Sequence, residues 1–207
     1  MQDDAAFVTY TGREVDLENL STDMICLQDL AHHLSLICRF AGAVKTFYSV
    51  AEHCMYCDDL YIEMCKGKDK LNIVRQRLLL MLHDAHEFIT GDIPSYPKMY
   101  APEISLLQKR IDEVIFAKFK LDNVSLKERT IVKIIDWLAL KGEAKILLPS
   151  GLKRILDIEK KQGGDCKLPV IFPEVIGDWW AVKLKYLQRM DKLINSYCDL
   201  ENKQCQN

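Results

Sequence analysis

The sequence predicts an all-α protein, a single helical domain preceded by a short N-terminal hairpin or extended arm. Three observations support this fold class. Apolar residues recur with the helical spacing of three to four over most of the 207 residues. Two Ser-x-x-Glu capping boxes mark the starts of helices. Prolines and glycines gather between the periodic segments, as is typical of helix boundaries and loops.

Length and composition are those of one globular domain, residues 1–207, with 49% hydrophobic and 28% charged residues. The net charge of −2 argues against duplex nucleic acid as a partner. No apolar run reaches the roughly 18 residues that span a bilayer, and the first ten residues lack a signal pattern. We therefore expect a cytoplasmic protein without membrane contact. Its eight cysteines are expected to be small buried thiols, and Cys54-x-x-Cys57 lacks the second pair of a zinc ribbon.

The first elements can be read in order. Residues 7–17 alternate apolar and polar around a Thr-Gly pair, which predicts the hairpin or arm. The apolar spacing predicts a first helix over Asp29–Phe40. The capping box from Ser49 to Glu52 predicts a second helix, which runs to about Lys66 with Gly67 as its C-cap.

A third helix is expected from about Lys70 to Ile89, before a loop enforced by two prolines. Pro102 opens a fourth helix. The second capping box, which starts at Ser125, opens a fifth. Residues 160–169 predict a mobile loop, and a last helix is expected from Pro173 to about Cys198.

Four residues stand out as candidates for chemistry. His83 and Asp84 end an apolar run, His53 lies in the first turn of a helix, and Asp136 interrupts the apolar stretch IVKIIDWLAL. A buried carboxylate needs a counter-charge, hydrogen bonds or a metal. Two imidazoles and two carboxylates form a ligand set suited to Mn, Fe, Co, Ni, Zn or Mg. Taken singly, each residue also fits an ordinary core histidine or surface aspartate.

The same residues carry a resemblance to a known family. The pattern H…HD…D, with "CRF…FYSVAEH" and "LHDAHEFITGDIPSYPK", resembles the HD-domain phosphohydrolases, in particular the phage-type dATP triphosphohydrolases and the bacterial 5′-deoxynucleotidase. The resemblance covers residues from about 9 to 140, and 141–207 form a helical C-terminal extension without a motif. The segment His83-x-x-His86-Glu87 also resembles the zinc-binding motif of the inverted zincins, but the sequence offers no third ligand at the expected position.

The resemblance implies roles for nine residues. The metal ligands would be His53, His83, Asp84 and Asp136. The catalytic carboxylates would be Glu87, as acid or base, and Asp92, near the attacking water. The contacts to substrate phosphate would be Arg39, Lys98 and Lys133. His86 departs from the pattern, because relatives often have a small residue there.

The resemblance implies a hydrolase that holds one divalent transition metal, Mn, Co, Zn, Fe or Ni, with Mg also open. No histidine lies between His86 and Asp136, which favours one ion over two. The expected substrate is a dNTP similar to dATP. A 5′-deoxynucleotidase acting on dNMPs, a hydrolase of a signalling nucleotide and an inactive binding module are the alternatives. The resemblance also implies a homo-oligomer, and Trp179-Trp180 in the last helix suits either an interface or the core.

Aromatic residues that flank the motifs could stack on a nucleotide base, and they could equally belong to the core. These residues are Phe40, Phe47, Tyr48 and Tyr96.

Overall fold

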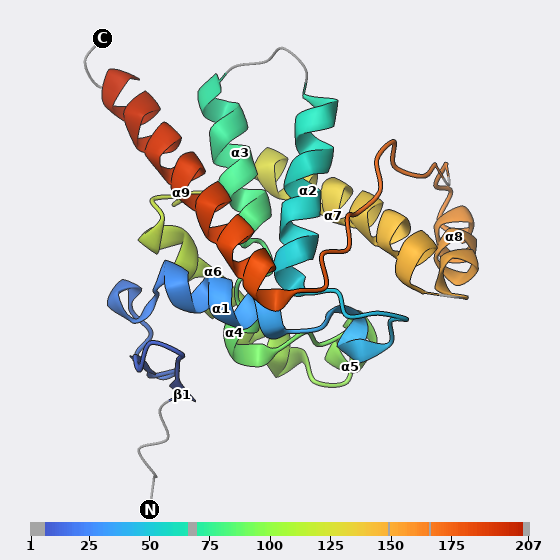
Figure 1. Ribbon diagram of the computed structural model, residues 1–207, viewed down its shortest axis with the longest axis horizontal. Coiled ribbons are helices and arrows are strands. Elements are labelled where there is room, and N and C mark those ends of the chain that lie inside the picture. Colours follow the sequence, from blue (N-terminus) through green and yellow to red (C-terminus); the bar gives the residue numbers. More distant parts are fainter. Residues whose placement is uncertain (1–6, 66–69, 149, 166, 205–207) are drawn as a thin grey trace, which may run out of the picture.

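The computed structural model describes residues 7–65, 70–148, 150–165 and 167–204, and it confirms the all-α prediction (Figure 1). The predicted C-cap Gly67 lies outside these residues. A two-stranded antiparallel hairpin precedes the helices, as the sequence predicts. In chain order the elements are β1 Phe7–Val8, β2 Glu14–Val15, the 3-10 turn Thr22–Met24, α1 Leu27–Leu36, the 3-10 turn Arg39–Gly42, α2 Val50–Met64, α3 Lys70–Leu82, α4 Glu87–Thr90, α5 Ser95–Lys98, α6 Pro102–Lys118, α7 Leu126–Leu147, α8 Gly151–Lys161 and α9 Trp179–Gln204.

The helices pack around one main core. α2 and α3 lie side by side, α9 packs on α1, α2 and α3, and α7 packs on α2 and α3 (Figure 1). The centre is filled by leucines and other apolar side chains that are fully buried, among them Leu30, Leu34, Leu78, Leu79 and Leu82. Burial of each such side chain stabilises the fold by about 1.5–3 kcal/mol.

Both predicted capping boxes are confirmed. At the start of α2, Ser49 Oγ accepts from the Glu52 backbone N–H at 3.2 Å, and Glu52 Oε2 accepts from the Ser49 N–H at 2.7 Å. Ser125 and Glu128 repeat the arrangement at α7. Glu52 does more, because its Oε1 accepts from the backbone N–H of Ile176 at 2.7 Å. The segment before α9 is thereby attached to the first turn of α2.

The prediction that the first helix reaches Phe40 is wrong. α1 ends at Leu36, and the chain then pairs in an extended conformation with the segment before α2, where the Arg39 N–H donates to Tyr48 O at 2.8 Å. Phe40 and Ala41 follow with φ values of 57° and 49°. This left-handed conformation costs roughly 1–2 kcal/mol per residue. It makes a sharp bend beside Arg39.

The prediction of one helix from Lys70 to Ile89 is also wrong. α3 ends at Leu82, and the next residues form turns in which the Ala85 N–H donates to Leu82 O and the Glu87 N–H to Asp84 O, both at 3.0 Å. His83 contributes to the break, since its Nδ1 lies 2.8 Å from Leu80 O. His83 and Glu87 therefore do not share the face of one helix.

Two short helices and both ends of the last helix also differ from expectation. Residues 95–98, expected as loop, form α5, and α8 was not predicted and takes the first two residues of the expected 160–169 loop. The last helix begins at Trp179 rather than just after Pro173, and it continues past Cys198. Asp178 sets this start, because its Oδ1 accepts from the Trp180 N–H at 3.0 Å.

No helix in the described part of the chain is long and apolar enough to cross a bilayer.

The exposed capping box allows a direct test of local stability. Ser125→Ala removes the acceptor for the Glu128 N–H, so we expect a loss of about 1 kcal/mol. For a chain of this size that loss lowers the Tm by about 2–4 °C. The control Ser105→Ala changes an exposed serine inside α6. Thermal unfolding by circular dichroism should show no decrease for the control, and an equal decrease in both variants would contradict the prediction.

Candidate metal centre

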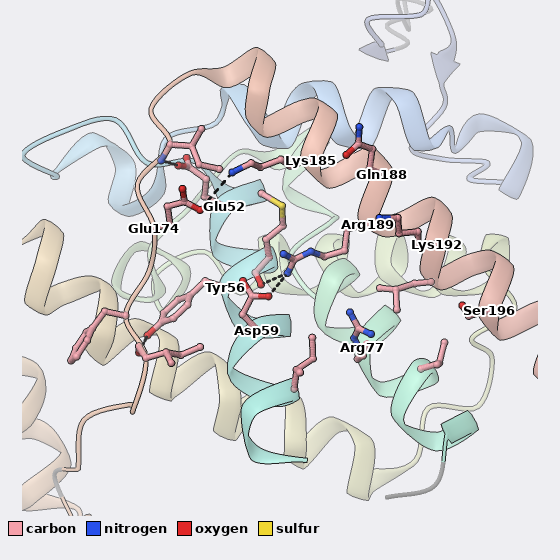
Figure 2. A pocket seen from close by; sticks show the side chains of 17 residues that line it. Glu52, Tyr56, Asp59, Arg77, Glu174, Lys185, Gln188, Arg189, Lys192 and Ser196 are labelled. Atoms are coloured by element: carbon pink, nitrogen blue, oxygen red, sulfur yellow. Dashed lines mark hydrogen bonds and ion pairs between the residues drawn. The ribbon is translucent and has the colours of Figure 1, made fainter. Parts of the chain in front are cut away.

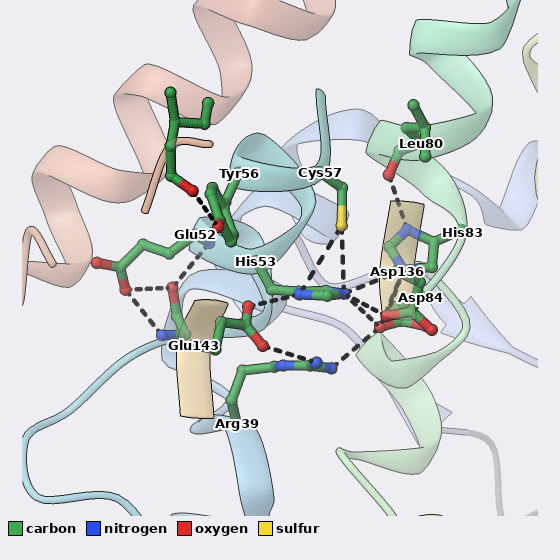
Figure 3. Close-up of polar contacts among 12 residues, drawn as sticks. Arg39, Glu52, His53, Tyr56, Cys57, Leu80, His83, Asp84, Asp136 and Glu143 are labelled. Carbon is green, nitrogen blue, oxygen red and sulfur yellow. Dashed lines mark hydrogen bonds and ion pairs between the residues drawn. The ribbon is translucent and has the colours of Figure 1, made fainter. Parts of the chain in front are cut away.

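The four predicted ligands come together from three separate parts of the chain (Figure 3). His53 comes from the first turn of α2, His83 and Asp84 from the turn after α3, and Asp136 from the middle of α7. The Nε2 atoms of the two histidines are 3.1 Å apart. Asp84 Oδ2 lies 3.5 Å from His53 Nε2 and 3.4 Å from His83 Nε2. Asp136 Oδ1 lies 3.2 and 3.9 Å from the same two atoms.

These separations fit a single metal ion. Two donor atoms that each lie about 2.1 Å from one ion are about 3.0–3.4 Å apart at octahedral or tetrahedral angles. Both histidines also have the Nδ1 atom engaged with an oxygen acceptor, which leaves the Nε2 lone pair for an ion. The cluster could therefore hold a metal ion.

Glu143 is a central residue that the sequence reasoning missed. It is fully buried, its Oε1 lies 2.6 Å from His53 Nδ1, and its Oε2 accepts from Arg39 Nη2 at 3.2 Å. A carboxylate at Nδ1 fixes the tautomer and orientation of a metal-binding histidine. One signal was present in the sequence, because Glu143 follows Asp136 by seven residues, two helical turns along the same face of α7.

A glycine allows this approach of α7 to α2. A Cβ atom at Gly142 would overlap the hydroxyl of Tyr56, whose O–H donates to Ile171 O at 2.8 Å. The small residue next to Glu143 therefore lets its carboxylate reach His53.

Arg39 lies inside the cluster rather than at its surface. It is 8% exposed, and its Nη1 donates to Asp84 Oδ2 at 3.3 Å while Nη2 contacts Glu143. The same guanidinium thus bridges a candidate ligand and the carboxylate that supports His53 (Figure 3).

The charges of the cluster depend on one another. Burial lowers the pKa of His83, but the carboxylates of Asp84 and Asp136 outweigh it and hold this pKa well above its usual value. Burial raises the pKa of Asp136, yet hydrogen bonds to His53 and His83 hold it well below its usual value. The imidazoles and the carboxylates therefore stabilise each other's charged forms. A metal ion that binds the Nε2 atoms would displace any proton on them.

Cys57 is near the ligands without facing the ion position. Its sulfur belongs to a group of four donor atoms, with His53, His83 and Asp136, that lie within 4.8 Å of one another. However, Cys57 Sγ is 3.6 Å from His53 Nε2 and 3.9 Å from His53 Nδ1. Such similar distances place the sulfur beside the imidazole ring and not in front of Nε2. Asp84 is the better fourth ligand.

The two predicted catalytic carboxylates lie beside the ligands. Glu87 is 3% exposed, and burial, followed by the charges of Asp84 and Asp92, raises its pKa to about 9. Arg39 and Lys98 act on Glu87 in the opposite direction. Asp92 accepts at Oδ2 from the Ala41 N–H at 3.2 Å, which attaches it to the bend after Arg39.

The remaining predicted residues divide into two groups. Lys98 lies on α5 and acts on Glu87, as described above. Lys133 is exposed and lines a separate, mostly apolar pocket of about 620 Å³ between α2, α7 and residues 165 and 167–171. No hydrogen bond or ion pair within the described ranges joins it to the ligands. Of the aromatic candidates, Tyr48 is fully buried in the core, and Tyr96 is 66% exposed.

A second hollow of about 590 Å³ lies among α2, α3, α9 and residues 171–176 (Figure 2). Its charged side chains are largely paired. Arg189 contacts Asp59 at 2.7 Å, Lys185 contacts Glu174 at 3.5 Å, and Arg77 contacts Asp58 at 2.8 Å. The metal centre therefore remains the better candidate for chemistry.

Comparison with known proteins gives relatives but no activity. No protein-family model matches the chain. It is 33% identical to the uncharacterized protein YfdR of Escherichia coli K12 over 141 residues, which are 67% of this chain and 70% of YfdR. It is 34% identical to an uncharacterized protein of Rhodobacter capsulatus over 85 residues, which are 40% of this chain and 41% of that relative.

The support that Glu143 gives to His53 can be tested through metal affinity. Glu143→Gln removes the charge but keeps the size, and we expect binding of Mn²⁺ or Zn²⁺ to weaken about 10–100-fold. The matched control is Glu103→Gln at an exposed position of α6. Isothermal titration on folded protein measures both variants, and unchanged affinity in Glu143→Gln would show that the contact does not support the ligand.

Proposed function

The chain belongs to the same family as YfdR of Escherichia coli, and from its ligand cluster we propose that it is a metal-dependent phosphohydrolase of the HD-domain type, acting on deoxynucleotides. A dNTP similar to dATP is the proposed substrate, cleaved to a deoxynucleoside and triphosphate. The observation that carries the proposal is the convergence of two imidazoles and two carboxylates, with spacing for one ion, beside a buried carboxyl group.

His53, His83, Asp84 and Asp136 would hold the ion, and Glu143 would keep His53 in the required tautomer. When bound, a divalent ion polarises a phosphate oxygen and lowers the pKa of water. The donor set suits Mn, Co, Zn, Fe or Ni, and Mg less well because Mg prefers oxygen ligands.

Glu87 has the properties of a proton donor. Burial and the charges of Asp84 and Asp92 raise its pKa to about 9, which favours a protonated carboxyl group that can donate a proton to the leaving oxygen of the substrate. Asp92 is partly exposed and fixed by the Ala41 N–H, and it can accept a hydrogen bond from the attacking water. A positioned acid or base typically contributes about 10²–10⁴-fold in rate.

Lys98 is the lysine that can reach phosphate. It lies on α5 beside Glu87 and is partly exposed, whereas the charge of Arg39 is already shared between Asp84 and Glu143. Lys133 lines a different pocket. The preference for a triphosphate over a monophosphate therefore rests on the sequence resemblance.

The direct test is an assay of the purified chain with Mn²⁺, Co²⁺ or Zn²⁺ and a panel of dNTPs and dNMPs. We expect metal-dependent release of triphosphate from dATP, detected by chromatography, and its loss on adding a chelator. Asp136→Asn should abolish the activity. Release of phosphate from dAMP would instead identify a 5′-deoxynucleotidase. A metal-loaded protein that cleaves none of these nucleotides would contradict both the triphosphohydrolase and the 5′-deoxynucleotidase proposals.

The lysines provide a matched pair of variants. Lys98→Met should raise the KM for the nucleotide by about tenfold, which corresponds to the loss of about 1.4 kcal/mol of binding energy. Lys133→Met should leave KM and kcat unchanged, because Lys133 lines the separate pocket. Steady-state kinetics with the substrate identified above would measure both, and the reverse result would assign phosphate binding to Lys133.

A further inference from the structure

His86 has the same kind of support as His53, although the metal centre described above does not use it. Its Nδ1 lies 2.9 Å from Asp112 Oδ1, just as His53 Nδ1 lies 2.6 Å from Glu143 Oε1. A carboxylate only accepts hydrogen bonds, so Nδ1–H donates and the Nε2 lone pair of each neutral ring is left for another partner. His86, like His53, therefore has a carboxylate at Nδ1 and an Nε2 lone pair that can bind an ion.

Within the described part of the chain, four buried side-chain polar atoms have no hydrogen-bond partner: Arg39 Nε, Tyr48 Oη, His86 Nε2 and Glu87 Oε2. The last two belong to residues that are only 7% and 3% exposed. An unsatisfied buried polar atom costs about 1–3 kcal/mol. A ligand that binds both His86 Nε2 and Glu87 Oε2 would remove this free-energy cost at each atom.

Asp84 lies close to both residues. Asp84, His86 and Glu87 each offer a donor atom, and the three donor atoms lie within 4.8 Å of one another. Asp84 Oδ2 already faces His53 and His83, but a carboxylate has two oxygens. Bridging carboxylates hold pairs of ions about 3.5–4 Å apart in two-metal sites.

We propose that Asp84, His86 and Glu87 form a second divalent-cation site next to the first, with Asp84 shared between the two ions and Asp112 orienting His86. Its nitrogen and oxygen donors suit Mn²⁺, Co²⁺ or Zn²⁺. The existence of this site depends only on these side chains and not on the identity of the substrate. Its role rests on the proposed function: an ion there would bind phosphate oxygens of the substrate. Glu87 would then lose its proton and serve as a ligand instead of as the proton donor, and Asp92 would remain to position water.

The test is the number of ions that the full chain binds. Mn²⁺ is the probe, because it avoids the thiols of this cysteine-rich chain. Isothermal titration with elemental analysis should give two equivalents for the unmodified protein and one for His86→Ala. Asp112→Asn should weaken the second equivalent about 10–100-fold. His32→Ala, which changes a histidine of α1 outside both clusters, should retain two. Electron paramagnetic resonance should show a coupled Mn²⁺ pair that disappears in His86→Ala.

A single equivalent in the unmodified protein at saturating Mn²⁺ would overturn the proposal, whatever the variants do. So would two equivalents retained in folded His86→Ala. In the first case, a single ion with nucleotide hydrolysis would leave the proposed function intact. Two bound ions without hydrolysis of any nucleotide would support the second site and contradict the proposed function.

Discussion

The candidate site depends on one fully buried carboxylate, Glu143. A charge in that position is stable only with opposite charges around it, and His53 and Arg39 supply them from distant parts of the chain. Pairing with Glu143 brings α7 against α2, which requires the glycine beside it, and holds Arg39 in the bend after α1. Arg39 then positions Asp84. A single electrostatic requirement thus links four separate segments.

Local sequence signals predicted the fold well where the interactions are local. Both capping boxes and the proline at the start of α6 lie within a few residues of the helix starts that they determine, and all three starts were correct. The ends at Leu36 and Leu82 were missed because no glycine or proline marks them. They result from tertiary contacts, the pairing of residues 37–39 with 48–50 and the turn that directs His83 and Asp84 inward.

The clustering of His53, His83, Asp84 and Asp136 could be anticipated from sequence because these residues carry a family resemblance. Glu143 could not be assigned in the same way, since its partner His53 lies 90 residues earlier and only folding brings them together. The two lysines also show that closeness to a motif in the sequence does not determine closeness in the fold. Lys98 and Lys133 both lie near motifs in the sequence, but α5 places the first beside Glu87, whereas the second lies on an exposed face of α7.

The bond between Glu52 and the backbone of Ile176 has a consequence for synthesis on the ribosome. About 100 residues separate α3 from α9, which takes about 5–20 s to translate. During that interval α1, α2 and α3 lack the helix that covers them, and the first turn of α2, which carries His53, lacks its anchor. The nascent chain therefore exposes apolar surface until its last helix emerges, and this period is when it most needs protection from aggregation.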